Sequence, residues 1–191
     1  MTNPAVDRIS APEPRLLRSV LGHYPTGVVL VTAPGPAPAP AMVVGTFTSV
    51  SLDPPLVGFL PARTSTSWPR IRAAGRFCVN VLAADQHQVC LDFVARADHR
   101  WDRVVRHAPS GAPVLADALA WIDCDLAGEV EAGDHSFVTG LVRCVCMQRA
   151  EPPLLFLRGG YARPAAEPVV EARRFRTTLP IAGPGRPVQD Q

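Results

Sequence analysis

Short runs of β-branched and other apolar residues recur along the chain, separated by glycine, proline and polar residues. The runs are Gly27–Ala33, Ala41–Phe47, Leu56–Pro61, Phe77–Leu82, Ala118–Val130, Ser136–Gln148 and Pro153–Tyr161. Runs of this kind are typical of β-strands. Helical spacing is confined to Arg15–Gly22, Thr66–Gly75 and Ala84–Arg96. Because strands and helices do not alternate strictly, the pattern predicts a mainly β fold: a closed β-barrel with flanking helices, not a doubly wound sheet.

Two local patterns refine this prediction. Asp85 stands where the N-cap of the third helix is expected. In Ala118–Val130, the side chains of Trp121, Asp123 and Asp125 alternate with apolar ones, which predicts a strand with one solvated face.

Composition limits the possible functions. The 191 residues suffice for one domain with a substantial core, and the net charge of +2 is too small to indicate a nucleic-acid binder. All 19 basic residues are arginine, which excludes a P-loop lysine and a Schiff-base lysine. No apolar run approaches the ~18 residues of a membrane span, and no targeting segment is visible, so we expect a cytoplasmic protein without a membrane contact.

The two ends of the chain differ from the middle. Residues 1–14 and 164–191 are rich in proline, alanine and arginine, and we predict flexible arms on either side of a single domain at 15–163. For Glu171–Arg176 a solvated tail and a contact with a partner both fit the composition. The five cysteines are odd in number and lack a CxxC pair, which favours buried, reduced thiols and predicts no metal site.

The stretch from Gly45 to Pro55, "GTFTSVSLDPP", concentrates hydroxyl groups at the end of a predicted strand. Hydroxyl groups and free backbone N–H groups at such a place suit a phosphate or the edge of a flavin ring. A polar strand edge followed by an Asp-Pro-Pro turn is the alternative. The motifs of Rossmann cofactor sites, P-loop NTPases, α/β-hydrolases and zincins do not occur.

Four motifs follow one another along the chain: "PTG" from Pro25, "TFTSVSLDPPLVGF" from Thr46, "RFCVNVLAADQ" from Arg76 and "GDHSFVTGLV" from Gly133. Together they resemble the flavin reductase-like, FMN-binding split-barrel family, and in particular the short-chain NAD(P)H:flavin reductase components of two-component flavin-dependent monooxygenases. The resemblance implies a six-stranded split β-barrel that forms a homodimer. It also implies exchangeable FAD or FMN, NADH or NADPH as reductant, and a separate oxygenase that receives the reduced flavin.

The resemblance also implies the site residues. His135 is the implied catalytic residue, beside the nicotinamide. The implied cofactor-binding residues are Pro25, Thr26, Gly27, Val28, Thr46, Phe47, Thr48, Ser49, Val50, Ser51, Arg63, Ser65, Thr66, Trp68, Asn80, Asp134 and Tyr161. Where many relatives have Asn-Ser, this chain has Gly45-Thr46, which keeps the hydroxyl group and loses an amide.

Hydride transfer between a nicotinamide and a flavin needs alignment more than a strong protein acid or base. A site of hydroxyl groups and glycines with one titrating residue, His135, agrees with this chemistry. Some residues also fit plainer roles: His135 as a surface histidine, Trp68 as a core residue and Arg63 as a solvated cation. A redox protein that retains its flavin and a non-catalytic flavin-binding module are the alternative functions.

Overall fold

The structure is a computed structural model and describes residues 13–165. Its helices are α1 (Pro14–Leu21), α2 (Trp68–Ala74), α3 (His87–Ala95) and the 3-10 helix η1 (Asp98–Trp101). Its strands are β1 (Thr26–Gly27), β2 (Val29–Thr32), β3 (Ala41–Val44), β4 (Thr48–Leu52), β5 (Pro55–Phe59), β6 (Arg76–Val81), β7 (Val104–His107), β8 (Pro113–Leu115), β9 (Ala120–Ala132), β10 (His135–Met147), β11 (Leu155–Leu157) and β12 (Gly160–Ala162). The mainly β fold is confirmed.

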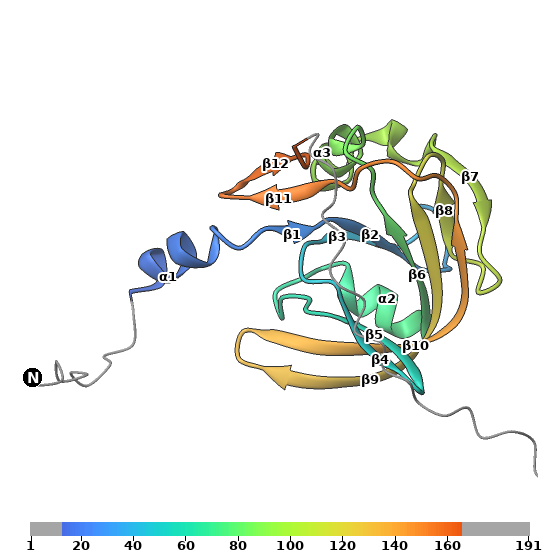
Figure 1. Ribbon diagram of the computed structural model, residues 1–191. Helices are drawn as coiled ribbons and strands as arrows, with labels where there is room; N and C mark the ends of the chain where they lie inside the picture. Colours follow the sequence, from blue (N-terminus) through green and yellow to red (C-terminus); the bar gives the residue numbers. More distant parts are fainter. Residues whose placement is uncertain (1–12, 166–191) are drawn as a thin grey trace, which may run out of the picture.

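The strands of the described chain form three sheets (Figure 1). The largest has seven strands in the order β3-β2-β6-β9-β10-β5-β4, all antiparallel. Smaller sheets join β1, β11 and β12, and β7 with β8. The two edges of the large sheet, β3 and β4, are consecutive in sequence but do not pair with each other. The prediction of a closed six-stranded barrel is therefore wrong in strand number and in closure.

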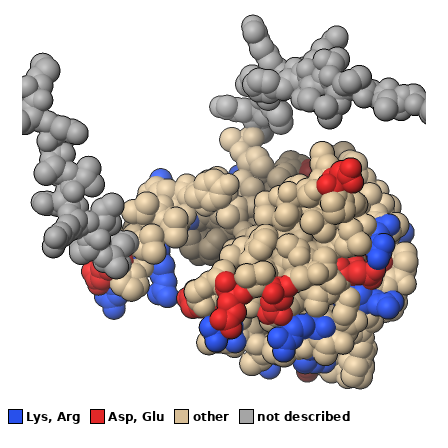
Figure 2. Space-filling model, turned by 90° about the horizontal axis from the view of Figure 1, so that it is seen from below, with Lys and Arg blue, Asp and Glu red and all other residues tan. Residues whose placement is uncertain are grey.

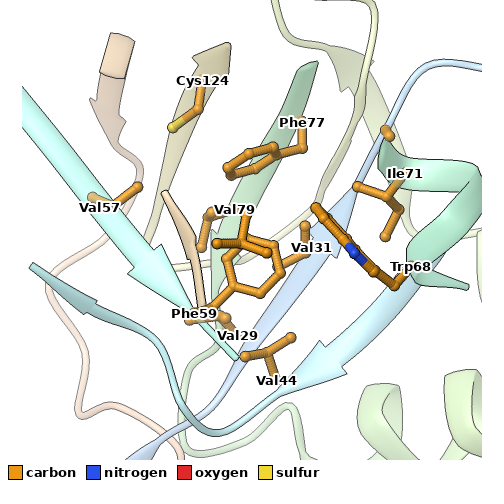
Figure 3. Packing of buried hydrophobic residues seen from close by; sticks show 12 residues of the cluster. Val29, Val31, Val44, Val57, Phe59, Trp68, Ile71, Phe77, Val79 and Cys124 are labelled. Atoms are coloured by element: carbon orange, nitrogen blue, oxygen red, sulfur yellow. The ribbon is translucent and has the colours of Figure 1, made fainter. Parts of the chain in front are cut away.

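A cluster of buried side chains fills the inside of the curved sheet (Figure 3). Trp68 and Ile71 of α2 point into this cluster from the helix. The Phe59 ring lies edge-on to Trp68, with ring centroids 5.6 Å apart, and edge-on to Phe77 at 5.4 Å. Burying side chains of this size stabilises the fold by about 1.5–3 kcal/mol each. The cluster thereby fixes α2 and the loop before it against the sheet.

Several local predictions need correction. The N-cap of α3 is Gln86, whose Oε1 accepts a hydrogen bond from the Ala83 N–H, and Asp85 instead pairs with Arg149. The Pro153–Tyr161 run forms the β11–β12 hairpin rather than one strand, because the positive φ angles of Arg158 and Gly159 turn the chain. The hydroxyl-rich run is itself a strand, β4, which pairs with β5.

The predicted solvated face of β9 is wrong for Trp121 and Asp123, whereas Asp125 on the same face is half-exposed and pairs with Arg143. Asp123 is only 2% exposed, because its carboxylate accepts hydrogen bonds from the Ser110 hydroxyl and from the Ser110 N–H at 2.9 Å. Trp121, on the same face, is 7% exposed. The loop before β8 supplies these partners, and the sequence pattern of β9 alone contains no sign of it.

Within residues 13–165 no helix is both long and apolar enough to cross a membrane. On the face seen from below, acidic and basic side chains lie next to one another and form no large area of one sign (Figure 2). The predicted arms lie largely outside the described residues, except that α1 begins at Pro14, inside the stretch predicted as an arm.

Candidate functional site

A cleft follows the outer edge of β3, the edge strand of the large sheet. Each residue of β3 lines it, together with Gly45 and Thr46, which continue the strand. Successive side chains of a strand point to opposite faces, so contact with consecutive residues means that the cleft reaches the strand edge. Two hollows meet at the Gly45–Thr46 end, and they share Val43, Gly45 and Thr46.

The first, the apolar hollow, has a volume of about 360 Å³ and lies between β1, β3 and the β11–β12 hairpin. Its lining residues are Thr26, Val28, Val43, Gly45, Thr46, Phe156 and Tyr161. The Phe156 and Tyr161 rings pack edge-on with centroids 5.7 Å apart. Burial, together with the neighbouring Cys90, raises the pKa of Tyr161 to about 12, so its phenol stays neutral in the physiological range. The hollow suits a flat, largely apolar ring.

The second, the hydroxyl hollow, has a volume of about 390 Å³ and continues from Thr46 toward α3. It is lined by Met42, Val43, Val44, Gly45, Thr46, Leu60, Pro61, Ala62, Ser65, Ser67, Phe93, Val94 and Arg96. No aspartate or glutamate is among these residues. Three hydroxyl groups and one guanidinium suit a ligand with many acceptor oxygens or a negative charge.

The Thr46 hydroxyl links the segment between β3 and β4 to the residue that follows β5. It accepts a hydrogen bond from the Leu60 N–H at 2.9 Å and donates one to the Leu60 carbonyl oxygen at 3.3 Å. Leu60 directly follows β5, so this pair of bonds extends the β4–β5 pairing, in which Thr48 lies opposite Gly58, toward the end of β3. Thr46 thus sets the width of the cleft at the point where the two hollows meet.

The loop between β5 and α2 supplies the far wall of the hydroxyl hollow. Ser65 Oγ accepts a hydrogen bond from the Trp68 N–H at 3.1 Å, and this bond fixes the first turn of α2. Thr66 Oγ1 accepts a bond from Arg96 Nη2 at 2.9 Å. Arg96 ends α3 in the left-handed conformation, with φ of 57°, which directs the chain away from the helix. Thr66 and Arg96 therefore link α2 and α3 across the cleft.

The turn Gly133-Asp134-His135 meets this loop from the other side. The Arg63 N–H donates to the Asp134 carbonyl oxygen at 2.9 Å, and His135 forms a β-bridge with Ala62. His135 Nδ1 lies 2.7 Å from Asp134 Oδ1, and this contact lowers the pKa of the Asp134 carboxyl group. His135 is half-exposed and lines neither hollow, but its bridge partner Ala62 belongs to the hydroxyl hollow.

Other predicted residues lie away from the cleft. Arg63 and Trp68 line a neighbouring hollow, which shares Ser65 with the hydroxyl hollow and also contains Glu129 and Glu131. Arg63 lies 3.7 Å from the Glu131 carboxylate. Trp68 is 5% exposed, and its Nε1 donates to Glu129 Oε1 at 2.9 Å. Burial acts to raise the pKa of Glu129, but the bonds from Trp68 and Ser136 and the Arg72 charge lower it overall. The two carboxylates make this hollow a poor phosphate site.

Asn80 has a structural role. It is fully buried, donates to the Leu30 carbonyl oxygen at 3.2 Å and accepts from the Leu115 N–H at 2.9 Å. These bonds join β2 and β6 to β8, so the amide is not available to a ligand in the cleft. The prediction that Asn80 closes the site is not supported by this geometry.

The remaining predicted site residues lie on β4, just before it, or next to Thr26. Thr48, Ser49 and Val50 are exposed on β4 and line neither hollow, and Ser51 beside them is half-buried. Phe47 packs against the core cluster. The exposed Pro25 and Gly27 flank Thr26 at the rim of the apolar hollow.

Sequence reasoning missed two important residues of the cleft, Arg96 and Phe156. Arg96 closes the predicted helix Ala84–Arg96, where an arginine is an ordinary last-turn residue. Phe156 lies in an apolar run whose Gly159-Gly160 pair is a hairpin signal, but the run was interpreted as one strand. Neither position has a motif, and only the approach of α3 and of the β11–β12 hairpin to β3 brings them to the site.

Comparison with known proteins shows the family of the chain. Residues 21–165 match the model of the flavin reductase like domain, and the chain belongs to this family. A flavin reductase of Pseudomonas putida is 49% identical over 169 residues, covering 87% of this chain and 99% of that protein. The reductase subunit HsaB of a flavin-dependent monooxygenase from Rhodococcus jostii is 40% identical, covering 78% and 77%.

A solved structure shows the same fold with ligands. The NADH:FAD oxidoreductase SgcE6 of Streptomyces globisporus, in complex with NAD and FAD fragments, superposes with a TM-score of 0.76 at 34% identity. The match covers 84% of this chain and 98% of that chain. The resemblance inferred from the four motifs is confirmed.

Proposed function

We propose that this protein is an NAD(P)H-dependent flavin reductase that supplies reduced FAD or FMN to a separate flavin-dependent monooxygenase. The observation that supports this most directly is the cleft along β3. Its apolar hollow fits an isoalloxazine ring, and its hydroxyl hollow, free of carboxylates, fits the ribityl chain and a phosphate. The monooxygenase role is supported by the relationship to HsaB.

The reaction moves a hydride from NADH to the flavin, and a solvent proton completes the reduced flavin. The cofactors carry this chemistry, so the chain has to hold the nicotinamide and flavin rings in contact and exclude competing reactions. The neutral Tyr161 phenol and the hydroxyl groups provide that orientation. We assign His135 to the nicotinamide, because it is half-exposed, lines neither of the two hollows assigned to the flavin ring and ribityl chain, and has its Nδ1 held by Asp134.

We further propose that flavin exchanges freely. The cleft is open, and the Thr46 and Thr66 hydroxyl groups are already engaged within the protein. The remaining neutral contacts contribute only about 1 kcal/mol each. A few such bonds and one apolar ring site give a dissociation constant on the order of micromolar.

A homodimer completes the proposal. Helix α1 has no buried residue and stands away from the sheets (Figure 1). Its apolar side chains Leu16, Leu17, Val20 and Leu21 are 44–61% exposed. An amphipathic helix of this kind gains stability only when its apolar face is covered. We infer that a second copy of the chain covers it, and light scattering at micromolar concentration tests this. We also expect a cytoplasmic location, where NADH is available.

Steady-state kinetics test the function. Purified protein should oxidise NADH only when FAD, FMN or riboflavin is added, and the protein should be colourless after dialysis. A yellow protein that keeps its flavin at full occupancy would support the flavin-retaining alternative. The absence of NADH oxidation with every flavin would leave only a flavin-binding module.

A further inference from the structure

A third hollow extends the cleft past the hydroxyl hollow. This arginine hollow, of about 250 Å³, lies between α2, α3 and η1 and shares Ser67, Phe93 and Arg96 with the hydroxyl hollow. It has three cationic residues: Arg70, Arg96 and Arg100. None of the residues that line it is acidic, and none of the three arginines forms an ion pair with an acidic residue of the described chain.

The three guanidinium groups are held in place but retain free donors. Arg70 Nη2 donates to the Pro38 carbonyl oxygen at 2.8 Å, and Arg96 Nη2 donates to Thr66. Arg100 Nη1 donates to the carbonyl oxygens of Arg96 and Ala97. These contacts occupy one nitrogen of each side chain, and a guanidinium has five N–H donors. The remaining donors form a site for phosphate oxygens, which arginine binds with two parallel hydrogen bonds.

A fourth hollow adjoins the arginines. This proline hollow, of about 500 Å³, shares Pro38, Ala39 and Trp101 with the arginine hollow. Its other lining residues are Gly35, Ala37, Val104, His107 and Pro113, so the surface is mainly apolar. The proline-rich loop between β2 and β3 forms one wall, and the Trp101 ring, packed edge-on against Phe93 at 4.9 Å, forms another. Such a surface suits a flat heterocyclic base.

The four hollows adjoin one another in a fixed order: apolar, hydroxyl, arginine, proline. The first three contact β3, and the proline hollow lies beyond it at the β2–β3 loop. Each shares lining residues with the next. A flavin dinucleotide has the matching order of parts: ring, polyol, diphosphate and adenosine. We propose that the arginine and proline hollows bind the adenosine-diphosphate end of FAD, so that FAD is the preferred flavin of this protein. This inference rests on the proposed function.

The charge and the length of the cleft both favour the dinucleotide over FMN. FMN ends at its single phosphate, which the hydroxyl hollow and Arg96 accommodate. Arg70, Arg100 and the proline hollow would then face water. Each charge-assisted bond from a partly exposed arginine is worth about 1 kcal/mol or more. FAD should therefore have a Michaelis constant at least tenfold lower than that of FMN, which corresponds to about 1.4 kcal/mol.

The test compares the Michaelis constants of FAD, FMN and riboflavin in wild type, Arg70→Met and Arg76→Met. Arg76 is exposed at the start of β6 and lines none of the four hollows, so it is the matched control for loss of one positive charge. Arg70→Met should raise the FAD constant relative to that of riboflavin about five- to tenfold. Arg76→Met should leave this ratio within about twofold of wild type.

A second measurement uses the unmodified protein. ADP carries the diphosphate and adenosine without a flavin ring, so it should compete with FAD and not with riboflavin. If FAD and FMN have equal constants and Arg70→Met behaves like Arg76→Met, the inference fails while the reductase function stands. If ADP competes with NADH whichever flavin is present, the hollows bind the dinucleotide reductant and the inference also fails. If no flavin is reduced, the proposed function itself fails.

Discussion

Replacing Thr46 by valine tests whether one hydroxyl group holds the cleft together. Valine keeps nearly the same shape and also favours a strand. The change removes both hydrogen bonds to Leu60, at 2.9 and 3.3 Å. Because Thr46 is exposed, water can replace part of what is lost, and each bond has a net value of about 0.5–1.5 kcal/mol. We expect the free energy of unfolding to fall by about 1–2 kcal/mol.

Thermal unfolding measures this change directly. For a domain of this size, 1 kcal/mol shifts the melting temperature by about 2–4 °C, so Thr46→Val should melt about 3–6 °C below wild type. Thr48→Val is the matched control: Thr48 is also exposed, but its hydroxyl donates only to the carbonyl oxygen of neighbouring Ser49. The control should melt within about 1 °C of wild type, since an exposed local contact contributes little.

The same pair of variants reports on the cleft. When the link between β3 and Leu60 is lost, the hydroxyl hollow should widen, and the Michaelis constants of FAD and riboflavin should rise together by several-fold in Thr46→Val. Equal melting temperatures for the two variants would refute the role of Thr46 as a link between the β3–β4 segment and Leu60. An altered melting temperature with unchanged flavin constants would refute its role in the cleft.

Three further predictions concern the core, the thiols and the reductant. Gly140→Ala should destabilise the fold by about 1–3 kcal/mol in denaturant titration, because the new Cβ meets the buried Phe77 ring. Gly160→Ala should have little effect, because its Cβ would only reach the Leu157 carbonyl oxygen at an ordinary contact distance of 3.9 Å. Burial raises the pKa of Cys90 to about 11, above the ordinary 9.0. Between pH 9 and pH 11, unfolding therefore releases the proton of this thiol. Stability should fall as pH rises above about 9, by on the order of 1 kcal/mol per pH unit for this thiol, and Cys90→Ala should show a shallower fall. His135→Ala should raise the NADH Michaelis constant or lower turnover about tenfold, roughly 1.4 kcal/mol, with flavin affinity by fluorescence quenching nearly unchanged; a collapse of flavin affinity with unchanged NADH dependence would contradict the assignment.

Local sequence patterns predicted most strands and all three α-helices, because apolar periodicity and turn residues act over short distances. They did not predict that β4 is a strand, since its hydroxyl groups resemble a loop and its pairing with β5 depends on the turn at Asp53 and Pro54. They also failed for Asp123, whose burial depends on Ser110 in a distant loop. Closure of the sheet is a property of two edges, and no single run of residues encodes it.

The candidate site was predictable to the extent that its residues stand in motifs. Thr26, Thr46, Ser65 and Tyr161 lie at the cleft as the resemblance implied. The resemblance implied Arg63 as a cofactor-binding residue. The structure places it with Glu131 instead, and Arg96, 33 positions further along the chain, faces the cleft. Which arginine of several reaches an anion depends on how helices pack, and that information is not local.

The cleft lies along a strand edge, and this has a consequence for the behaviour of the protein without ligand. An unpaired edge strand offers its backbone N–H and C=O groups to any other extended chain, and proteins usually cover or interrupt such edges to prevent aggregation. In β3, α2 and α3 flank the edge but leave the cleft between them. A bound flavin would fill that gap and act as a removable cover. Flavin added during expression or storage should therefore slow self-association through β3, independently of its part in the reaction.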